Sequence, residues 1–459
     1  MDRKKIVLIG AGSAMFTQGV VTQMIQSGRP WSLALVDTDP EALFVAEGVS
    51  RKTAEVGEAD IEIAGSTDRR DLLPGADFVV TTIGVGKRRA WEADVFIPRE
   101  FGIYQPVGDT IMAGGISRAL RMVPAMVDIA KDVHSLCPEA VFLNYANPMS
   151  VICWAINEAT NPEVTGLCIG VHGVKNHLAD FIGKPHDEVS CLAAGLNHFT
   201  WLYDLRWKGM DAWPLVREQL ARERGGTSEG STLDLVPGGD TVMAEAGVYV
   251  PKASDNPLCW ELFDAYGAYP SAEDRHVAEF FPERFPQGRY YGKQLGVDAF
   301  SFEGTIKFGD DIYDQMAAIA RGEVEVTKES LKGGLGEHSQ LMEIITSLEE
   351  DQRMTISANL ANRGAIPNLP EDAVLELTSV VTARGIMSLA VPDFPDLLAA
   401  PLARKIAGQR LTVEAALTGS RTLFVEALLA DGCVCDRAVA GRLADALLHA
   451  QREHLPQFA

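Results

Sequence analysis

The chain has 459 residues, of which 47% are hydrophobic and 23% charged, and its formal net charge is −22 at pH 7. This length allows two or three domains with a large core, whereas so much negative charge would repel nucleic acid and anionic membranes over most of the surface. No apolar run is long enough to cross a bilayer. The seven cysteines lack a disulfide-type spacing, so we expect a cytoplasmic protein that binds a small molecule.

The first half of the chain alternates between buried strands and helices. Residues 5–9, "KIVLI", predict a strand, and the glycine loop after it leads into a segment with apolar residues at helical spacing. Further strands are predicted at 31–37, 76–84, 140–148 and 164–170. This order is typical of βαβ units, and it predicts an α/β protein whose Rossmann-like parallel sheet domain covers residues 1–195.

After residue 195 the segments become longer and less regular. We expect a second, α+β domain at 196–459 that is largely helical. Its last part, from "LPEDAVLELTSVV" at 369–381 to "RLADALLHAQREHL" at 442–455, is rich in Ala and Leu and is predicted to be mostly helical.

The loop after the first strand reads Gly10-Ala11-Gly12-Ser13, with Met15 where the usual dinucleotide fingerprint has a third glycine. Two glycines still allow backbone N–H groups to approach a pyrophosphate at a helix N-terminus. Asp37 ends the second strand, where a carboxylate can accept hydrogen bonds from a ribose diol and would repel a ribose phosphate. The pattern predicts binding of NAD rather than NADP, although the same loop could be a tight turn in a fold without a cofactor.

Two isolated residues, Cys168 and His198, each follow an apolar segment. Taken singly, each is more often a buried core residue than a ligand. If both lie at the carboxyl edge of the sheet, their sulfur and nitrogen could hold a divalent metal and leave positions open for a substrate's oxygens.

Six motifs spread over nearly the whole chain resemble those of glycoside hydrolase family 4. They are "GAGS" with a following Phe16, "GIYQPVGDT" at 102–110, "NYANPM" at 144–149, "GLC" at 166–168, "GLNH" at 195–198 and "NLPEDAV" at 368–374. The resemblance implies a glycosidase that depends on NAD and on a divalent metal, commonly Mn²⁺, and that forms dimers or tetramers.

The resemblance also implies roles for individual residues. Cys168 and His198 match the metal ligands, and Asn147 matches a substrate-binding asparagine beside the metal. The residues that match the NAD site are Gly10, Gly12, Ser13, Phe16 and Asp37.

Hydrolysis in this family differs from the usual mechanism with two carboxylates. The resemblance implies that NAD⁺ takes a hydride from C3 of the sugar, which makes the proton on C2 acidic. A base removes that proton, the C1 substituent is expelled, water adds, and the hydride returns. An α-glycoside is the expected substrate, with glucosides, galactosides, uronides and sulfoquinovosides all remaining open.

The acid and base are predicted from the same resemblance. Asp109 matches the position of the acid, and Asp274 matches the base of α-glucosidase-like members, while Tyr266 or Tyr269 would suit members that use a tyrosine. Asp274 could instead lie in a solvated charged turn.

One position departs from the family pattern. Many members have His or Asp directly after the metal cysteine, where this chain has Ile169. Because isoleucine cannot transfer a proton, His172 could replace the missing acid, or it could be an ordinary loop histidine. The departure suggests a divergent subgroup or a sister family.

Basic residues are the remaining candidates for contact with the substrate. Lys87, Arg88 and Arg89 follow the third strand of the predictions and could neutralise pyrophosphate or an acidic sugar, or be solvated. Of these, Arg89 is a predicted substrate-binding residue, together with Arg275 and His276.

Two other functions fit parts of the sequence. An NAD-dependent dehydrogenase of a small hydroxy acid or sugar would use the same loop, and it would accumulate NADH during turnover. A redox-sensing, NAD-binding regulator without turnover would use the loop, but it would not need the "NYANP", "GLNH" and "EDRH" motifs.

Overall fold

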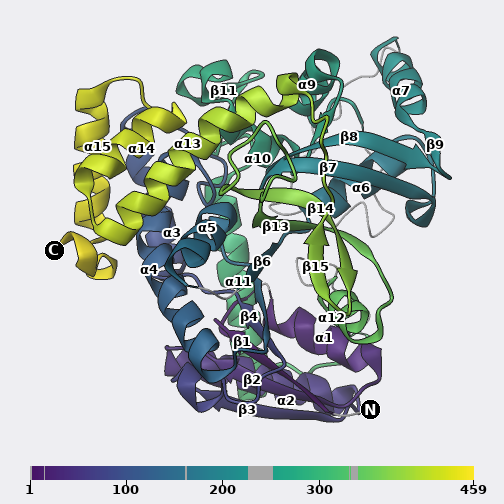
Figure 1. Ribbon diagram of the computed structural model, residues 1–459. Coiled ribbons are helices and arrows are strands. Elements are labelled where there is room, and N and C mark those ends of the chain that lie inside the picture. Colours follow the sequence, from purple (N-terminus) through teal and green to yellow (C-terminus); the bar gives the residue numbers. More distant parts are fainter. Residues whose placement is uncertain (1–2, 15, 161–162, 226–251, 330, 332–339) are drawn as a thin grey trace.

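The computed structural model describes residues 3–14, 16–160, 163–225, 252–329, 331 and 340–459. It confirms the predicted class: a Rossmann-like parallel sheet is followed by a mixed α+β region with a helical C-terminus (Figure 1).

The first part contains six parallel strands. They are β1 (Lys4–Ile9), β2 (Trp31–Val36), β3 (Ile61–Ser66), β4 (Phe78–Thr81), β5 (Val141–Asn144) and β6 (Val164–Leu167). Their order across the sheet is β6-β5-β4-β1-β2-β3, so the chain reverses direction in the sheet beside β1. All five predicted strands are present; β1 begins one residue earlier than predicted, and the other four are shorter. β3 was not predicted, and in its sequence "IEIAGS" no residue is fully buried.

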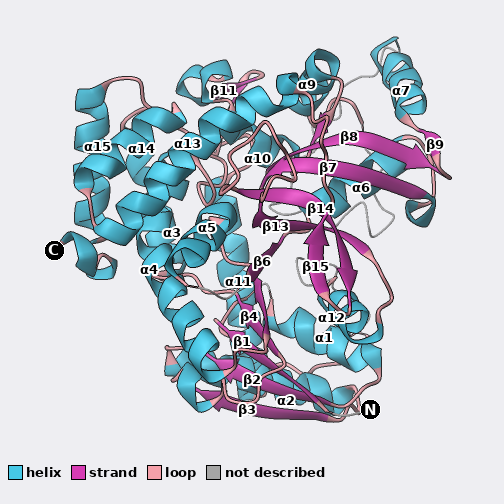
Figure 2. Ribbon diagram, viewed as in Figure 1, coloured by secondary structure: helices cyan, strands magenta, loops and turns pink. Residues whose placement is uncertain are grey.

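The second part contributes antiparallel strands to the same sheet. They are β7 (Val189–Leu196), β8 (Phe199–Trp207), β9 (Met210–Asp211), β10 (Tyr269–Pro270), β13 (Thr355–Ala361), β14 (Val374–Thr382) and β15 (Gly385–Ser388). β13 pairs with β6, and β14, β7, β8 and β10 follow in that order, so one sheet runs through both parts (Figure 2). The predicted boundary at residue 195 lies at the end of β7, and it stays a prediction. A small separate sheet pairs β11 (Arg289–Tyr290) with β12 (Lys293–Gln294).

The prediction of helix at 369–381 is wrong, because Val374–Thr382 forms β14. The segment "VLELTSVVT" is rich in β-branched residues, and it is buried on both faces between β13 and β7. A strand in this position has no alternating polar face, so its apolar run resembles that of a buried helix.

Helices cover both parts of the sheet. Those of the first part are α1 (Thr17–Ser27), α2 (Pro40–Val56), α3 (Lys87–Glu100), α4 (Met112–Leu136), α5 (Met149–Ala159) and α6 (Gly170–Phe181). Those that follow are α7 (Trp213–Gly225), α9 (Pro257–Tyr266), α10 (Glu273–Phe280), α11 (Phe302–Arg321), α12 (Leu341–Glu350), α13 (Asp396–Thr418), α14 (Arg421–Asp431) and α15 (Arg437–Ala450).

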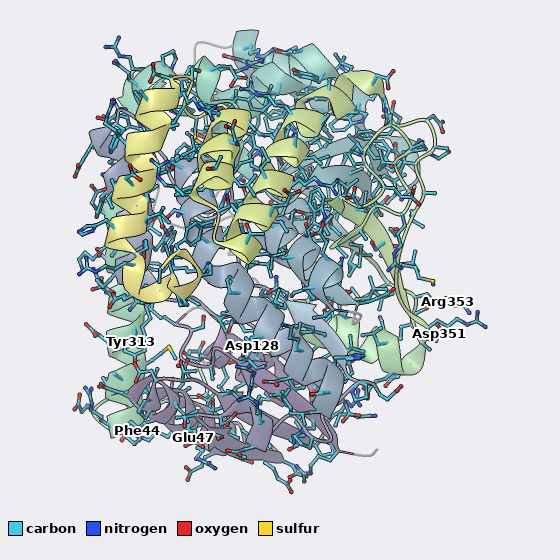
Figure 3. All side chains as sticks on the ribbon, turned by 60° about the vertical axis from the view of Figure 1, so that its left-hand side comes forward. Phe44, Glu47, Asp128, Tyr313, Asp351 and Arg353 are labelled. Carbon is cyan, nitrogen blue, oxygen red and sulfur yellow. The ribbon has the colours of Figure 1, made fainter. Side chains whose placement is uncertain are left out.

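The C-terminal helices pack back onto the first part of the chain. α13 contacts α4 and α5, and α15 contacts α3, so these segments lie side by side although they are far apart in the chain (Figure 1). α11 packs along α2, with Tyr313 of α11 and Phe44 of α2 at the surface of this side of the molecule (Figure 3). None of the helices in the described ranges is both long and apolar enough to span a membrane.

A buried ion pair links α3 to α4. Asp94 and Arg121 are joined by two hydrogen bonds, at 2.9 and 2.5 Å, and neither side chain is exposed. Ser117 and Gln451 also donate to Asp94, so the pair connects the C-terminal segment to both helices. The loop between α3 and α4 carries Asp109, so this ion pair holds together the two helices that flank this predicted site residue.

We expect Arg121→Met to destabilise the protein by about 3–5 kcal/mol, because it leaves the Asp94 carboxylate buried without its partner. Arg353→Met is the matched control, since it breaks the exposed Asp351–Arg353 pair (Figure 3). The midpoint of urea unfolding should fall clearly for the first variant and stay near wild type for the second. Equal midpoints for the two variants would contradict the importance of the buried pair.

Candidate active site

Several of the predicted residues follow the carboxyl ends of neighbouring parallel strands. Gly10 follows β1, Asn147 follows β5 and Cys168 follows β6. β1 and β5 both pair with β4, so the strands that lead into the glycine loop and toward Asn147 are about 10 Å apart, the spacing of two strands. In open α/β sheets ligands bind at this edge, where the strand order reverses.

The glycine loop is tightly packed and leaves no room for side chains. Gly10 has φ of 93°, and a β-carbon there would lie 2.8 Å from the backbone of Ile83. A β-carbon on Gly12 would lie 2.6 Å from that of Ala42. The Gly12 N–H donates to Asp37 Oδ2 at 2.8 Å, so the predicted ribose-binding carboxylate also holds the loop. These contacts fit a nucleotide-binding loop, in which backbone approaches the ligand closely.

Phe16 and Ser13, the other two predicted cofactor residues, make contacts within the protein. Phe16 is 3% exposed, and its ring packs on Tyr145 with centroids 4.6 Å apart. The Ser13 N–H donates to the Gly10 carbonyl at 3.1 Å. Both residues shape the loop, and a direct contact with the cofactor stays a prediction for each.

Two histidines and one carboxylate meet near this edge. One potential ligand atom from each of Asp109, His198 and His276 lies within 4.8 Å of the other two, the one such cluster among the described residues. The three residues come from the loop before α4, from the turn between β7 and β8, and from α10. Two nitrogens and one oxygen are a suitable donor set for a divalent transition metal.

Asp109 accepts a hydrogen bond at each of its oxygens. Thr110 Oγ1 donates to Oδ1 at 2.7 Å, and Asn147 Nδ2 donates to Oδ2 at 3.0 Å. Asn147 Oδ1 is itself buried and has no hydrogen-bond partner within the described part of the chain. Because leaving such an oxygen unsatisfied costs about 1–3 kcal/mol, its position supports the predicted role of Asn147 in binding a ligand.

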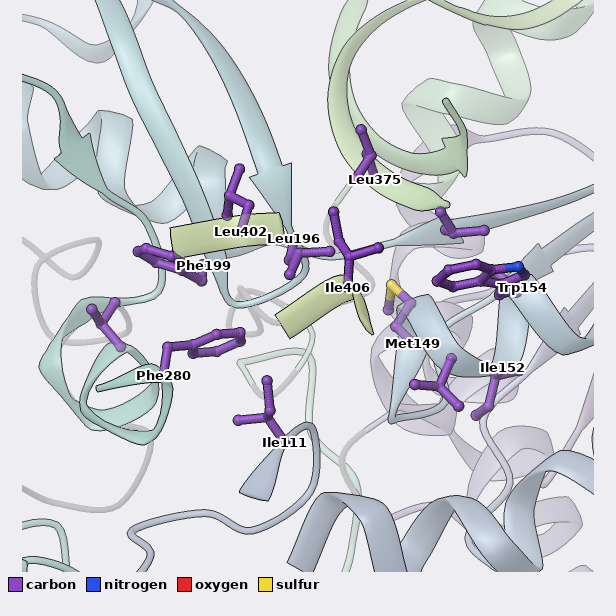
Figure 4. Packing of buried hydrophobic residues seen from close by; sticks show 14 of the residues in the cluster. Ile111, Met149, Ile152, Trp154, Leu196, Phe199, Phe280, Leu375, Leu402 and Ile406 are labelled. Carbon is purple, nitrogen blue, oxygen red and sulfur yellow. The ribbon is translucent and has the colours of Figure 1, made fainter. Parts of the chain in front are cut away.

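His198 occupies a strained position in the two-residue turn between β7 and β8. Its φ is 66°, in the left-handed region that residues with a β-carbon rarely adopt. Leu196 and Phe199, on either side of the turn, are buried in the hydrophobic core (Figure 4). Burial lowers the pKa of His198, and the charge of Asp109 opposes this shift. The imidazole is therefore neutral near pH 7, the state in which it can bind a metal.

His276 was predicted as a substrate-binding residue, and the structure places it in the cluster. Its ring centroid is 4.0 Å from that of His198. Burial lowers its pKa well below the usual value, and the nearby His198 and Arg275 lower it further. His276 Nδ1 is buried without a hydrogen-bond partner among the described residues, so the cluster contains a second unsatisfied polar atom.

Cys168 is not a member of this cluster. Its Sγ accepts a hydrogen bond from the Gly170 N–H at 3.3 Å, at the start of α6. A β-carbon on Gly170 would lie 3.4 Å from this sulfur and 3.5 Å from the β-carbon of Ala272. Cys168 therefore lies near the start of α10, the helix of His276. The role of Cys168 as a metal ligand beside His198 stays a prediction.

His172 is held by two side-chain amides, and it is not suited to the predicted role of acid. Its ring nitrogens contact the amides of Asn176 at 3.1 Å and Gln340 at 3.0 Å. Burial lowers its pKa to about 4, so the ring has no extra proton to donate near pH 7. We therefore assign His172 to the packing of α6 against the segment before α12.

Asp274, the predicted base, caps a helix instead. Its side chain is fully buried, and its oxygens accept hydrogen bonds from the N–H groups of Leu258 and Cys259, at 2.7 and 2.8 Å. Tyr290 Oη donates to it at 2.6 Å. The two N–H groups belong to the first turn of α9, where a carboxylate satisfies unpaired donors. With these contacts Asp274 serves the fold, and we do not retain it as the base.

The two tyrosines considered as a base lie in the apolar core around β8. Tyr269 is fully buried, and burial raises its pKa well above the usual value. Tyr266 is half-buried, with its ring 5.0 Å from that of Trp201. A base role for either tyrosine stays a prediction.

The predicted basic residues divide into two groups. Arg89 pairs with Glu92 at 2.5 Å and also with Asp310, so its charge is neutralised at the contact between α3 and α11, and we assign it to that contact. Arg275 donates to Thr305 at 3.0 Å, and its charge lowers the pKa of both cluster histidines. Of the two arginines, Arg275 is therefore the one beside the cluster.

Two residues of the site were missed by the sequence analysis. Thr110 lies between Asp109 and His198, with Oγ1 2.8 Å from His198 Nδ1. Glu279 Oε1 accepts hydrogen bonds from the N–H groups of Val107 and Gly108, each at 2.8 Å, and so ties α10 to the loop of Asp109. A carboxylate between Ala278 and Phe280 on a short helix could have been noticed as a buried charge.

The fold and the cluster together define an α/β enzyme with a nucleotide-binding half and a site for a divalent metal. The model of the family 4 glycosyl hydrolases matches residues 5–184, and that of their C-terminal domain matches residues 193–434. The chain therefore belongs to glycoside hydrolase family 4, and it is a glycoside hydrolase.

Individual relatives match this chain along nearly their whole length. An α-galactosidase of Bacillus subtilis is 30% identical, with 93% of both chains covered. An α-glucosidase of Erwinia rhapontici is also 30% identical, covering 98% of both chains. A 6-phospho-α-glucosidase from gut microorganisms, solved with NAD and Mn²⁺, has the same fold with a TM-score of 0.82 and 17% identity, and the match covers 100% of both chains.

Glu279→Gln should make stability less dependent on pH. Burial raises the pKa of Glu279 to about 8 from 4.5, so between these values the unfolded chain has lost a proton that the folded chain keeps. Wild-type stability therefore falls as pH rises through this window, by at most about 1.4 kcal/mol per pH unit, and the fall ends above pH 8. A glutamine can still accept from the Val107 and Gly108 N–H groups but cannot titrate.

Urea unfolding at pH 5, 6.5 and 8 measures this difference. The midpoint of Glu279→Gln should rise relative to wild type as pH increases, while the exposed Glu283→Gln variant should follow wild type. Parallel profiles for all three proteins would contradict a buried, protonated Glu279.

Proposed function

We propose that this enzyme cleaves α-linked glycosides with the help of NAD and a divalent metal, by transient oxidation at C3 of the sugar. The observation that carries the proposal is the Asp109, His198 and His276 cluster at the same sheet edge as the glycine loop. The α-linkage is supported by the α-galactosidase and α-glucosidase relatives. When bound, NAD would supply reversible oxidation of C3, and the metal would polarise the sugar oxygens so that the C2 proton becomes acidic.

The loop residues fit NAD. Gly10 and Gly12 leave the backbone bare at the start of α1, and Asp37 keeps acceptor capacity beyond its bonds to the Gly12 and Asp39 N–H groups. The solved relative with NAD supports this cofactor. In this chain the roles of Gly10 and Gly12 are to admit the pyrophosphate, and that of Asp37 is to bind a ribose diol.

The cluster residues fit a metal such as Mn²⁺. His198 is buried and His276 half-buried, the pKa of each is lowered so that both rings are neutral near pH 7, and His276 Nδ1 and Asn147 Oδ1 have no partner among the residues described. We propose that His198, Asp109 and His276 hold the metal, with Cys168 as the predicted further ligand. In this proposal the role of metal ligand replaces the predicted role of Asp109 as the acid. Asn147 then orients a sugar hydroxyl through Oδ1 while its Nδ2 holds Asp109 in place.

We also propose that the enzyme works in the cytoplasm as a homo-oligomer. All seven cysteines are free, which suits a reducing compartment. The oligomer, a dimer or a tetramer, is proposed from the family resemblance.

A screen of nitrophenyl α-glycosides tests the function. Aglycone release should require both NAD and Mn²⁺ and should proceed without net NADH accumulation, whereas a dehydrogenase would accumulate NADH. In D₂O the product should acquire deuterium at C2, because the proton removed there can exchange before it returns. Release without NAD, or a product with no deuterium and no isotope effect from a 2-deuterated substrate, would contradict the proposal.

Substitution of cluster residues tests the metal site. We expect His276→Ala to weaken Mn²⁺ binding by more than the 10–100-fold that typically follows loss of an outer-shell partner. NAD affinity should stay near wild type, because none of the three cluster residues belongs to the glycine loop after β1 or to the end of β2 that carries Asp37. Mn²⁺ titration measures the effect, with Cys168→Ser beside it to test the predicted sulfur ligand. Wild-type Mn²⁺ affinity in His276→Ala would overturn the proposed site.

A further inference from the structure

Thr110 stands between two of the proposed metal ligands. Its Oγ1 is 2.7 Å from Asp109 Oδ1 and 2.8 Å from His198 Nδ1, and the residue is 4% exposed. The three side chains therefore form a chain of hydrogen bonds in which Thr110 and His198 are buried and Asp109 is half-buried.

Counting protons fixes the direction of these hydrogen bonds. A threonine hydroxyl has one proton, and an ionised carboxylate can only accept. The hydroxyl of Thr110 must therefore donate to Asp109, which leaves only its lone pairs to face His198 Nδ1. A ring nitrogen this close to a lone pair makes a hydrogen bond only if it carries the proton.

We propose that Thr110 is a positioning residue that keeps His198 in the tautomer with its proton on Nδ1, so that the Nε2 lone pair is free for a ligand. A neutral imidazole has one protonated and one unprotonated nitrogen, so fixing the proton on one nitrogen frees the other. Outer-shell hydrogen bonds of this kind orient metal-binding histidines and raise their basicity.

The backbone holds Thr110 firmly in this position. Gly114 and Gly115, at the start of α4, pack on Gly108 and Thr110, and a β-carbon on Gly115 would clash with the Thr110 carbonyl carbon. On the other side, Glu279 binds the Val107 and Gly108 N–H groups. Thr110 therefore has little freedom to turn its hydroxyl away from His198.

Three variants separate the hydroxyl from the shape of the side chain. Thr110→Val keeps the shape and removes the hydroxyl, and Thr110→Ser keeps the hydroxyl. Thr412→Val is the matched control, because Thr412 is also buried and its hydroxyl donates to the Gly408 carbonyl within α13.

The tautomer can be read from ¹⁵N NMR of the histidine rings in the metal-free, full-length protein at pH 8, with His198 assigned by its loss in His198→Gln. Wild type, Thr110→Ser and Thr412→Val should show Nδ1 protonated and Nε2 unprotonated, and Thr110→Val should shift the proton toward Nε2. A proton on Nε2 in wild type, or an unchanged tautomer in Thr110→Val, would overturn the proposal.

The consequence for metal binding rests on the proposed function and is measured separately. Thr110→Val should weaken Mn²⁺ binding by about 10–100-fold, and Thr110→Ser should restore most of the affinity. NAD affinity, as a control for folding, should not change. If wild type binds no Mn²⁺, the proposed metal fails while the tautomer result stands; if it binds Mn²⁺ and Thr110→Val binds equally well, Thr110 does not position the ligand.

Discussion

The site depends on one buried carboxyl group, Glu279 of α10. It accepts hydrogen bonds from the Val107 and Gly108 N–H groups, and this joins the helix of His276 to the loop of Asp109. These two segments are more than 160 residues apart in the chain, and a loop alone would not keep its side chains at hydrogen-bond distances from a separate hairpin. The contact is formed in a fully buried position, where an unsatisfied N–H group would be costly.

A second buried network supports the turn of His198. Asn197 donates to Glu376 of β14 at 3.2 Å, and Ser357 of β13 donates to the other oxygen of Glu376 at 3.1 Å. Burial raises the pKa of Glu376 to about 7. The antiparallel half of the sheet therefore positions His198, while the parallel half provides the glycine loop and Asn147. The continuous sheet lets both halves contribute to one site, because β13 pairs directly with β6.

The three basic residues at the start of α3 form ion pairs between helices. Lys87 pairs with Asp39, and Arg88 and Arg89 pair with Asp310, which fastens α3 to α2 and α11. These ion pairs neutralise the three cations that were predicted as candidates to bind pyrophosphate or an acidic sugar. Arg275 remains beside the cluster, where it favours neutral histidines.

The sequence by itself determined the local features of this protein. The apolar runs and the glycine loop predicted the parallel strands and the edge at which ligands bind, since strand period and glycine geometry are local properties. Only the tertiary structure decided which polar residues meet. It paired His276 with His198, used Asp274 as a helix cap, and formed β14 from an apolar run without alternation. Contacts between segments far apart in the chain depend on packing and burial, which no local pattern encodes.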